Sequence, residues 1–110
     1  VCEIDMRSGG TFRTVMQGPD GQSFDNSGGF LEVVPARKVV FTDAYVNAWT
    51  PSAKPFMTAI ITMDDEGKKT KYGARVLHWN AADLEEHVKM GFHDGWGQCA
   101  DQLAALAKTL

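Results

Sequence analysis

The segment from Phe92 to Leu110 carries the most regular apolar pattern in the chain. At about 100° per residue, alternating spacings of four and three keep side chains on one narrow stripe of an α-helix. The pattern therefore predicts a C-terminal helix with one apolar face, and such a face needs a sheet or another helix to cover it. The stripe consists of Phe92, Trp96, Cys99, Leu103, Leu106 and Leu110.

The first four fifths of the chain follow a different period, because apolar and polar residues alternate at every second position. Clusters of Gly, Pro, Asp and Ser separate these runs and are typical of tight turns. Strands joined by short turns without intervening helices predict an antiparallel sheet. The paired glycines Gly28 and Gly29 indicate a bulge, a sharp bend or a close backbone approach. We expect strands at 2–7, 12–16, 22–34, 38–46, 56–63 and 70–79.

Two residues indicate where the helical region begins and where it is interrupted. Asn80 is a predicted N-cap, and Gly91 is predicted to break or kink the helix that starts there. Gly91, Gly95 and Gly97 have three explanations: part of this turn is not helical, Gly91 and Gly95 allow close packing against the sheet, or the glycines thin the wall of a cavity. The expected fold class is α+β, a curved antiparallel sheet of about six strands packed on the long C-terminal helix. Residues 1–110 are expected to form one domain.

Composition argues against several function classes. The formal net charge is -3, which argues against a surface for nucleic acid or for anionic membranes. No apolar run approaches the roughly 18 residues of a membrane span. The ordinary balance of apolar and charged residues predicts a cytoplasmic globular protein, in which Cys2 and Cys99 stay reduced.

Aromatic residues, Phe41 among them, concentrate where the predicted sheet meets the predicted helix. Such rings usually form a core. Alternatively they line an apolar pocket, for which the five methionines offer an adaptable surface. On the second interpretation the predicted ligand-binding residues are Phe12, Phe30, Trp49, Phe56, Tyr72, His78, Trp79, Phe92 and Trp96.

Motifs for catalysis and for metals are absent from the sequence. His87 and His93 are six residues apart, which does not place them on one helical face, so no zinc site and no cofactor are predicted. No catalytic residue set is predicted either, and an enzyme is the less favoured interpretation. If the protein is an enzyme, Glu32 and His78 are the candidates for acid or base. The simpler alternatives are a solvated charge for Glu32 and a satisfied core or rim residue for His78.

Three motifs together resemble a known family. The run 91–98 followed by Asp101-Gln102-Leu103 is similar to the C-terminal helix of the activator of heat-shock protein 90 ATPase homologue-like family. Residues 9–13 and the segment 31–42 are similar to its strand patterns, so the resemblance spans the whole chain. This family belongs to the START/SRPBCC superfamily.

The resemblance implies the helix-grip fold, with a cavity between the sheet and the C-terminal helix. The family's N-terminal strand and two short helices have no counterpart here, so the domain is expected to be N-terminally incomplete. Superfamily members bind apolar molecules, which makes an apolar small-molecule ligand the leading expectation. The alternatives are a co-chaperone or protein-interaction module and a cyclase- or dehydratase-like enzyme. An uncovered sheet edge also favours pairing with a second copy as a homodimer.

Overall fold

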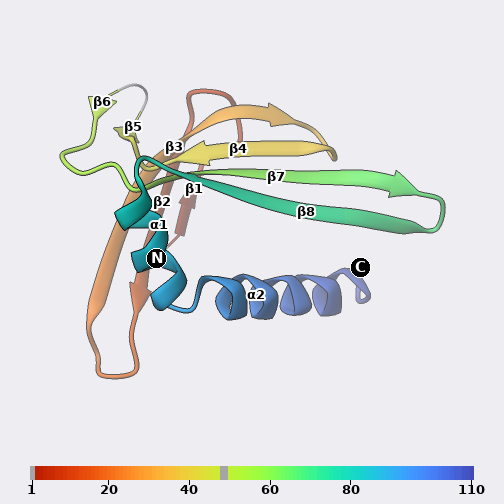
Figure 1. Cartoon of the computed structure of the whole chain (residues 1–110). Helices are drawn as coiled ribbons and strands as arrows, with labels where there is room; N and C mark the ends of the chain where they lie inside the picture. Colours follow the sequence, from red (N-terminus) through yellow and green to blue (C-terminus); the bar gives the residue numbers. More distant parts are fainter. Residues whose placement is uncertain (1, 48–49) are drawn as a thin grey trace. The chain divides into compact units, whose positions relative to one another are not determined.

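A six-stranded antiparallel sheet is the largest part of the fold in the computed structural model, which describes residues 2–47 and 50–110 (Figure 1). Its strand order is β1-β2-β3-β4-β7-β8, so each strand pairs with the one before it except where β5 and β6 intervene. These two form a separate small ladder. The strands of the large sheet are β1 (Cys2–Ile4), β2 (Thr11–Gln17), β3 (Ser23–Val34), β4 (Lys38–Thr42), β7 (Met57–Glu66) and β8 (Lys69–His78), and those of the small one β5 (Tyr45–Asn47) and β6 (Thr50–Pro51).

The predicted strands are confirmed, but three of them end several residues from where they were expected to end. The expected strand at 2–7 ends at Ile4. The expected strand at 38–46 ends at Thr42, because Asp43 leaves the ladder to bind backbone amides at the start of β7. The strand expected at 56–63 instead runs to Glu66, so that only Gly67 and Lys68 remain between β7 and β8, which pair to their ends. Opposite charges face each other there, as in the pair Glu66 and Lys69, and such cross-strand pairs favour continued pairing.

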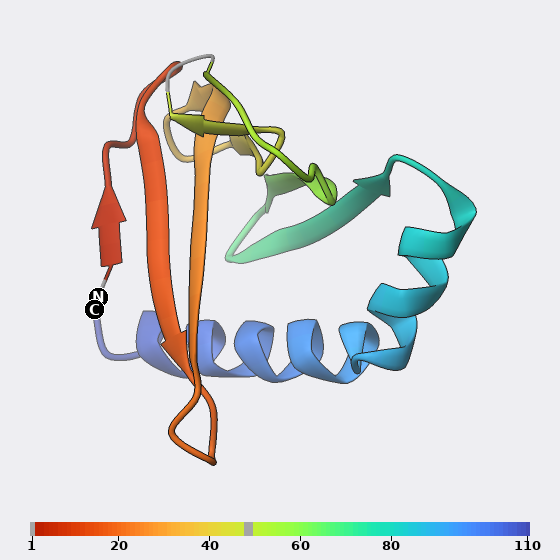
Figure 2. The same ribbon diagram turned by 90° about the vertical axis from the view of Figure 1, so that its left-hand side faces the viewer.

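The paired glycines lie where β3 changes partners. Residues 23–29 of β3 pair with β2 (Figure 2), and the strand then continues along β4 (Figure 1). At Gly28 the carbonyl oxygen of Thr42 lies so close that an added Cβ would overlap it. A register shift between Phe30 and Glu32 follows immediately. The predicted close approach and bulge are therefore both present. They lie where β3 passes from pairing with β2 to pairing with β4.

The buried centre of the sheet lies around Phe30, which is 1% exposed. Backbone hydrogen bonds hold this residue from the β1–β2 turn: Gly9 donates to its carbonyl at 2.8 Å, and its amide donates to Gly10 at 3.0 Å. Val40 and Ala59 are also buried, on β4 and β7. The core therefore depends on the register of the middle strands.

Two helices, α1 (Ala81–Lys89) and α2 (Phe92–Ala107), follow the last strand. Asn80 caps α1 as predicted, since its Oδ1 accepts a 2.8 Å hydrogen bond from the amide of Asp83. Gly91 separates the helices with φ of 89°, a left-handed conformation that glycine adopts without strain. No helix among the described residues is long and apolar enough to cross a membrane.

The fold class is α+β, with a six-stranded antiparallel sheet and a C-terminal helix, as in the helix-grip fold. The chain divides into two compact units, which we call the sheet unit (Val1–His78) and the helical unit (Trp79–Leu110). The expectation of a single domain stays a prediction. Inside the helical unit, an added Cβ at Gly95 or Gly97 would meet no atom within 4 Å, so packing within this unit does not explain these glycines.

Candidate functional site

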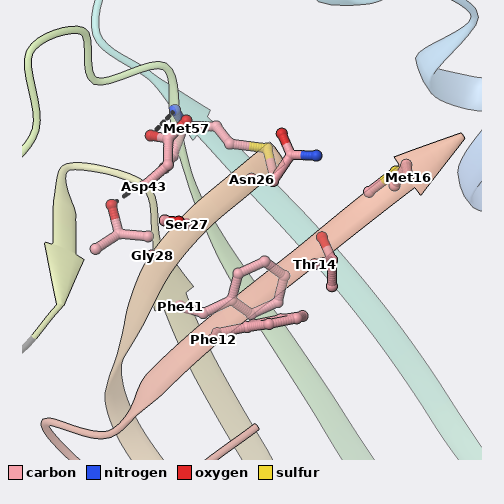
Figure 3. Close-up of a pocket in the computed structure, with 10 residues that line it drawn as sticks. Phe12, Thr14, Met16, Asn26, Ser27, Gly28, Phe41, Asp43 and Met57 are labelled. Atoms are coloured by element: carbon pink, nitrogen blue, oxygen red, sulfur yellow. Dashed lines mark hydrogen bonds between the residues drawn. The ribbon is translucent and has the colours of Figure 1, made fainter. Parts of the chain in front are cut away.

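A pocket of about 140 Å³ opens on the sheet unit (Figure 3). The middle strands β2, β3, β4 and β7 and the residue after β4 supply its lining, so all of it belongs to one compact unit. Its surface is predominantly apolar, with a few polar groups, which is the usual character of a small-molecule site. The lining residues are Phe12, Thr14, Met16, Asn26, Ser27, Gly28, Phe41, Thr42, Asp43 and Met57.

Strand alternation brings the apolar residues to one face of the sheet, which we call the pocket face. Phe12, Thr14 and Met16 lie two residues apart on β2 and therefore share a face. Their cross-strand partners include Asn26 and Gly28 of β3. The pocket thus follows from period two combined with the observed register.

An aromatic cluster forms one wall of this pocket. The rings of Phe12 and Phe41 lie 5.0 Å apart at 63°, an edge-to-face arrangement (Figure 3). Behind them Phe30 stacks on Phe12 at 5.1 Å. Both geometries are favourable for aromatic pairs. The buried Phe30 thereby supports the two rings that the pocket exposes.

Hydrogen bonds fix the end of β4 against the start of β7. The hydroxyl of Thr42, which is 3% exposed, donates to the carbonyl of Met57 at 3.1 Å and accepts from Thr58 at 2.9 Å. Next to it, Oδ1 of Asp43 accepts from the amides of Phe56 at 2.8 Å and Met57 at 3.0 Å. These bonds hold Met57 and Asp43 at the pocket edge.

The opposite face of the sheet carries an ion cluster. Arg13 of β2 lies between Asp25, at 3.0 Å, and Glu3, at 3.5 Å. The hydrogen bond from Arg13 holds the pKa of Asp25 below its usual value of 3.8. In return, the hydrogen bond to Asp25 raises the pKa of Arg13. This arrangement links β1, β2 and β3 and contributes nothing to the pocket lining.

The predicted site residues divide between the two units. Phe12 lines the pocket and Phe30 lies directly behind it. Next to the lining residue Met57, Phe56 contacts His78 with ring centroids 5.6 Å apart. Tyr72 of β8 is 37% exposed. None of these last three lines the pocket described here.

The remaining predicted residues are in the helical unit or outside the description. Trp49 lies outside the described residues. Trp79 is 57% exposed at the start of the helical unit. Phe92 and Trp96 contact each other on α2 at 6.1 Å, and Phe92 also contacts His87 at 4.7 Å. A ligand-binding role for these residues stays a prediction.

Most of the lining was missed from the sequence, although some signals were present. Phe41 was among the aromatic residues expected near the helix but not among the predicted ligand-binding residues, and Met16 extends the face of Phe12. Asp43 follows a strand directly and is flanked by Thr42, a pattern typical of a side chain that binds backbone amides. What alternation does not supply is the cross-strand register that brings Met57 next to these residues.

The candidates for acid–base chemistry do not form a pair. Glu32 forms a 3.2 Å ion pair with Lys38, and its cross-strand partner Val40 lies on the face opposite the pocket. His78 pairs with Met57 and therefore belongs to the pocket face. Among residues 2–47 and 50–110, no group of three or more His, Cys, Asp and Glu residues is arranged to hold a metal ion.

The family model described as Activator of Hsp90 ATPase homolog 1-like protein matches residues 1–108. Among the curated proteins, none matches the sequence significantly.

Two solved structures are similar to this chain. Protein NE0264 from Nitrosomonas europaea is 41% identical with a TM-score of 0.93, and the match covers 98% of this chain and 70% of that protein. Protein Ms6760 from Mycobacterium smegmatis is 21% identical with a TM-score of 0.77, covering 97% and 66%. The second similarity concerns the fold alone.

Proposed function

Because this chain belongs to the Activator of Hsp90 ATPase homolog 1-like family of the START/SRPBCC superfamily, we propose that it binds a small molecule with an apolar body in the pocket of the sheet unit. The observation that carries this proposal is the pocket itself, in which two phenylalanine rings and two methionines converge on one face of the sheet. Methionine side chains adapt to ligands of different shape.

The pocket volume limits the size of the ligand. A cavity of about 150 Å³ lined by apolar side chains accommodates benzene. The present pocket, at about 140 Å³, is therefore suited to one aromatic ring or a short alkyl chain. The hydroxyl of Thr14 and the amide of Asn26 provide polar groups that orient such a ligand.

A neutral probe tests this function. We expect 2-phenylethanol, titrated into isotopically labelled protein, to shift the backbone amide signals of Gly28 and Thr14 saturably. Met16→Lys should weaken this binding about tenfold, because it places a charge in the apolar lining. The matched control is Met6→Lys, since Met6 is exposed to a similar extent, 53% against 57%, and does not line the pocket. Equal weakening by both variants, or no saturable shift, would contradict the proposal.

Chaperone stimulation is the second candidate, and the family match favours it. It predicts that the protein accelerates ATP hydrolysis by Hsp90. A rate that stays flat up to saturating protein would eliminate this candidate. That experiment is independent of the pocket, because it needs no small-molecule ligand.

A further inference from the structure

Among the described residues, the pocket lining contains one formal charge. Asp43 is the single ionisable residue of this described lining, to which no lysine, arginine or histidine contributes. The nearest basic residue on β2, Arg13, lies on the opposite face and is paired with Glu3 and Asp25. The field inside the pocket is therefore negative, which favours cations over anions.

Both hydrogen bonds to the carboxylate of Asp43 go to one of its two oxygens. Its Oδ1 accepts both amide hydrogen bonds, from Phe56 and Met57. Within the described part of the chain, its Oδ2 has no hydrogen bond and the side chain has no ion-pair partner. The side chain is half-buried, so the surrounding protein partly removes its hydration. An ammonium group that donates to Oδ2 would supply the missing partner.

The aromatic wall favours the same kind of ligand. The faces of Phe12 and Phe41 carry the negative part of the ring quadrupole, which attracts cations as well as apolar groups. Methionine sulfur is a weak acceptor and adds no positive charge. The aromatic rings and the carboxylate therefore both favour a cationic ligand with an apolar body.

We infer that the ligand of this pocket is a small organic amine. Its protonated amine pairs with Oδ2 of Asp43, and its ring or alkyl body packs against Phe12 and Phe41. This inference rests on the proposed function, which it deepens by excluding fatty acids and other carboxylates as preferred ligands.

Three probes of nearly equal size separate charge from apolar contact. They are 2-phenylethylamine, which is protonated at pH 7, neutral 2-phenylethanol, and anionic phenylacetate. Calorimetric titration should give the amine a Kd about tenfold lower than that of the alcohol, with the carboxylate the weakest. The preference should decrease as salt is added, because salt screens a half-exposed pair.

Asp43→Asn tests the residue. The amide oxygen of asparagine still accepts the hydrogen bonds from Phe56 and Met57, so the loop keeps its anchor while the charge is lost. The amine should lose about tenfold in affinity and bind like the alcohol, whose affinity should not change. Asp64→Asn is the matched control, since Asp64 lies on β7 outside the pocket and loses the same charge.

The outcomes are distinguishable. Equal Kd values for the three probes with the wild-type protein would overturn the inference and leave the proposed function standing. Absence of binding by all three would overturn the proposed function as well. If Asp43→Asn fails to fold, the wild-type order of the probes still decides, because a carboxylate that binds as tightly as the amine contradicts a site built on Asp43.

Discussion

The two units of the molecule both contain an aromatic cluster, and they assemble it differently. In the sheet unit, Phe12, Phe30 and Phe41 come from three strands and meet through long-range pairing. In the helical unit, Phe92 meets its neighbours on the same or the preceding helix, and neither helix contains a buried residue. The comparison shows that contact between rings is not equivalent to burial. In the sheet unit the strand register buries one ring almost completely, next to the rings that line the pocket.

The largest expected difference follows from truncating one ring in each cluster. Phe30→Ala should lower the free energy of unfolding by about 3–5 kcal/mol, because it leaves a cavity under the pocket wall. Phe92→Ala removes a half-buried ring and should cost about 1 kcal/mol. Urea denaturation measures both values. Equal losses of unfolding free energy would mean that the two aromatic clusters contribute equally to stability, which would contradict the difference in burial between them.

Replacing one glycine by alanine in each unit should give the next largest change in stability, with opposite signs in the two units. Gly28→Ala forces the new Cβ against the Thr42 carbonyl and should destabilise the protein by about 2 kcal/mol. Gly95→Ala lies in α2 with open space around it and should stabilise the helix by about 1 kcal/mol. Thermal unfolding followed by circular dichroism distinguishes them. A stabilising Gly28→Ala would show that the strands separate freely at this point.

The smallest effect concerns the ion cluster on the face opposite the pocket. Because Arg13 lowers the pKa of Asp25, the charged carboxylate stabilises the fold above the unfolded pKa, and this contribution disappears as the pH falls through the folded pKa. The exposed pair should contribute little. Asp25→Asn should therefore unfold at a slightly lower urea concentration than wild type at pH 7. At about pH 2 the two midpoints should coincide.

A second variant provides the control for that experiment. In an Arg13→Gln background, Asp25→Asn should have a smaller pH-dependent effect, since the main partner that lowers the pKa is missing and only the hydrogen bond from Ser27 remains. A difference between wild type and Asp25→Asn that persists unchanged at low pH would show that another property of residue 25 causes it.

Local patterns in the sequence were sufficient for the elements and their order. Alternation predicted the strands of the large sheet, and Asn80 and Gly91 predicted where the helices begin and separate. The expected end of α2 at Leu110 was too late, since the helix ends at Ala107. These features depend on neighbours along the chain, whose side chains and dihedral preferences can be evaluated without a fold.

The candidate site needed the tertiary structure. Alternation placed Phe12 on an apolar face, but the partners of that face depend on register, and a shift by one residue moves every side chain to the other side. The bulge after Phe30 and the close approach at Gly28 set the register between β3 and β4. The role of Asp43 is also a tertiary effect, because the amides that it binds are 13 and 14 residues away in sequence.

The sequence by itself therefore determined a sheet followed by two helices, an apolar face on that sheet and the family to which the chain belongs. Only the tertiary structure decided which apolar residues line a pocket, and that the carboxylate of Asp43 lies among them. The physical reason is that periodicity is a property of each strand alone, whereas a pocket requires several strands aligned in one register.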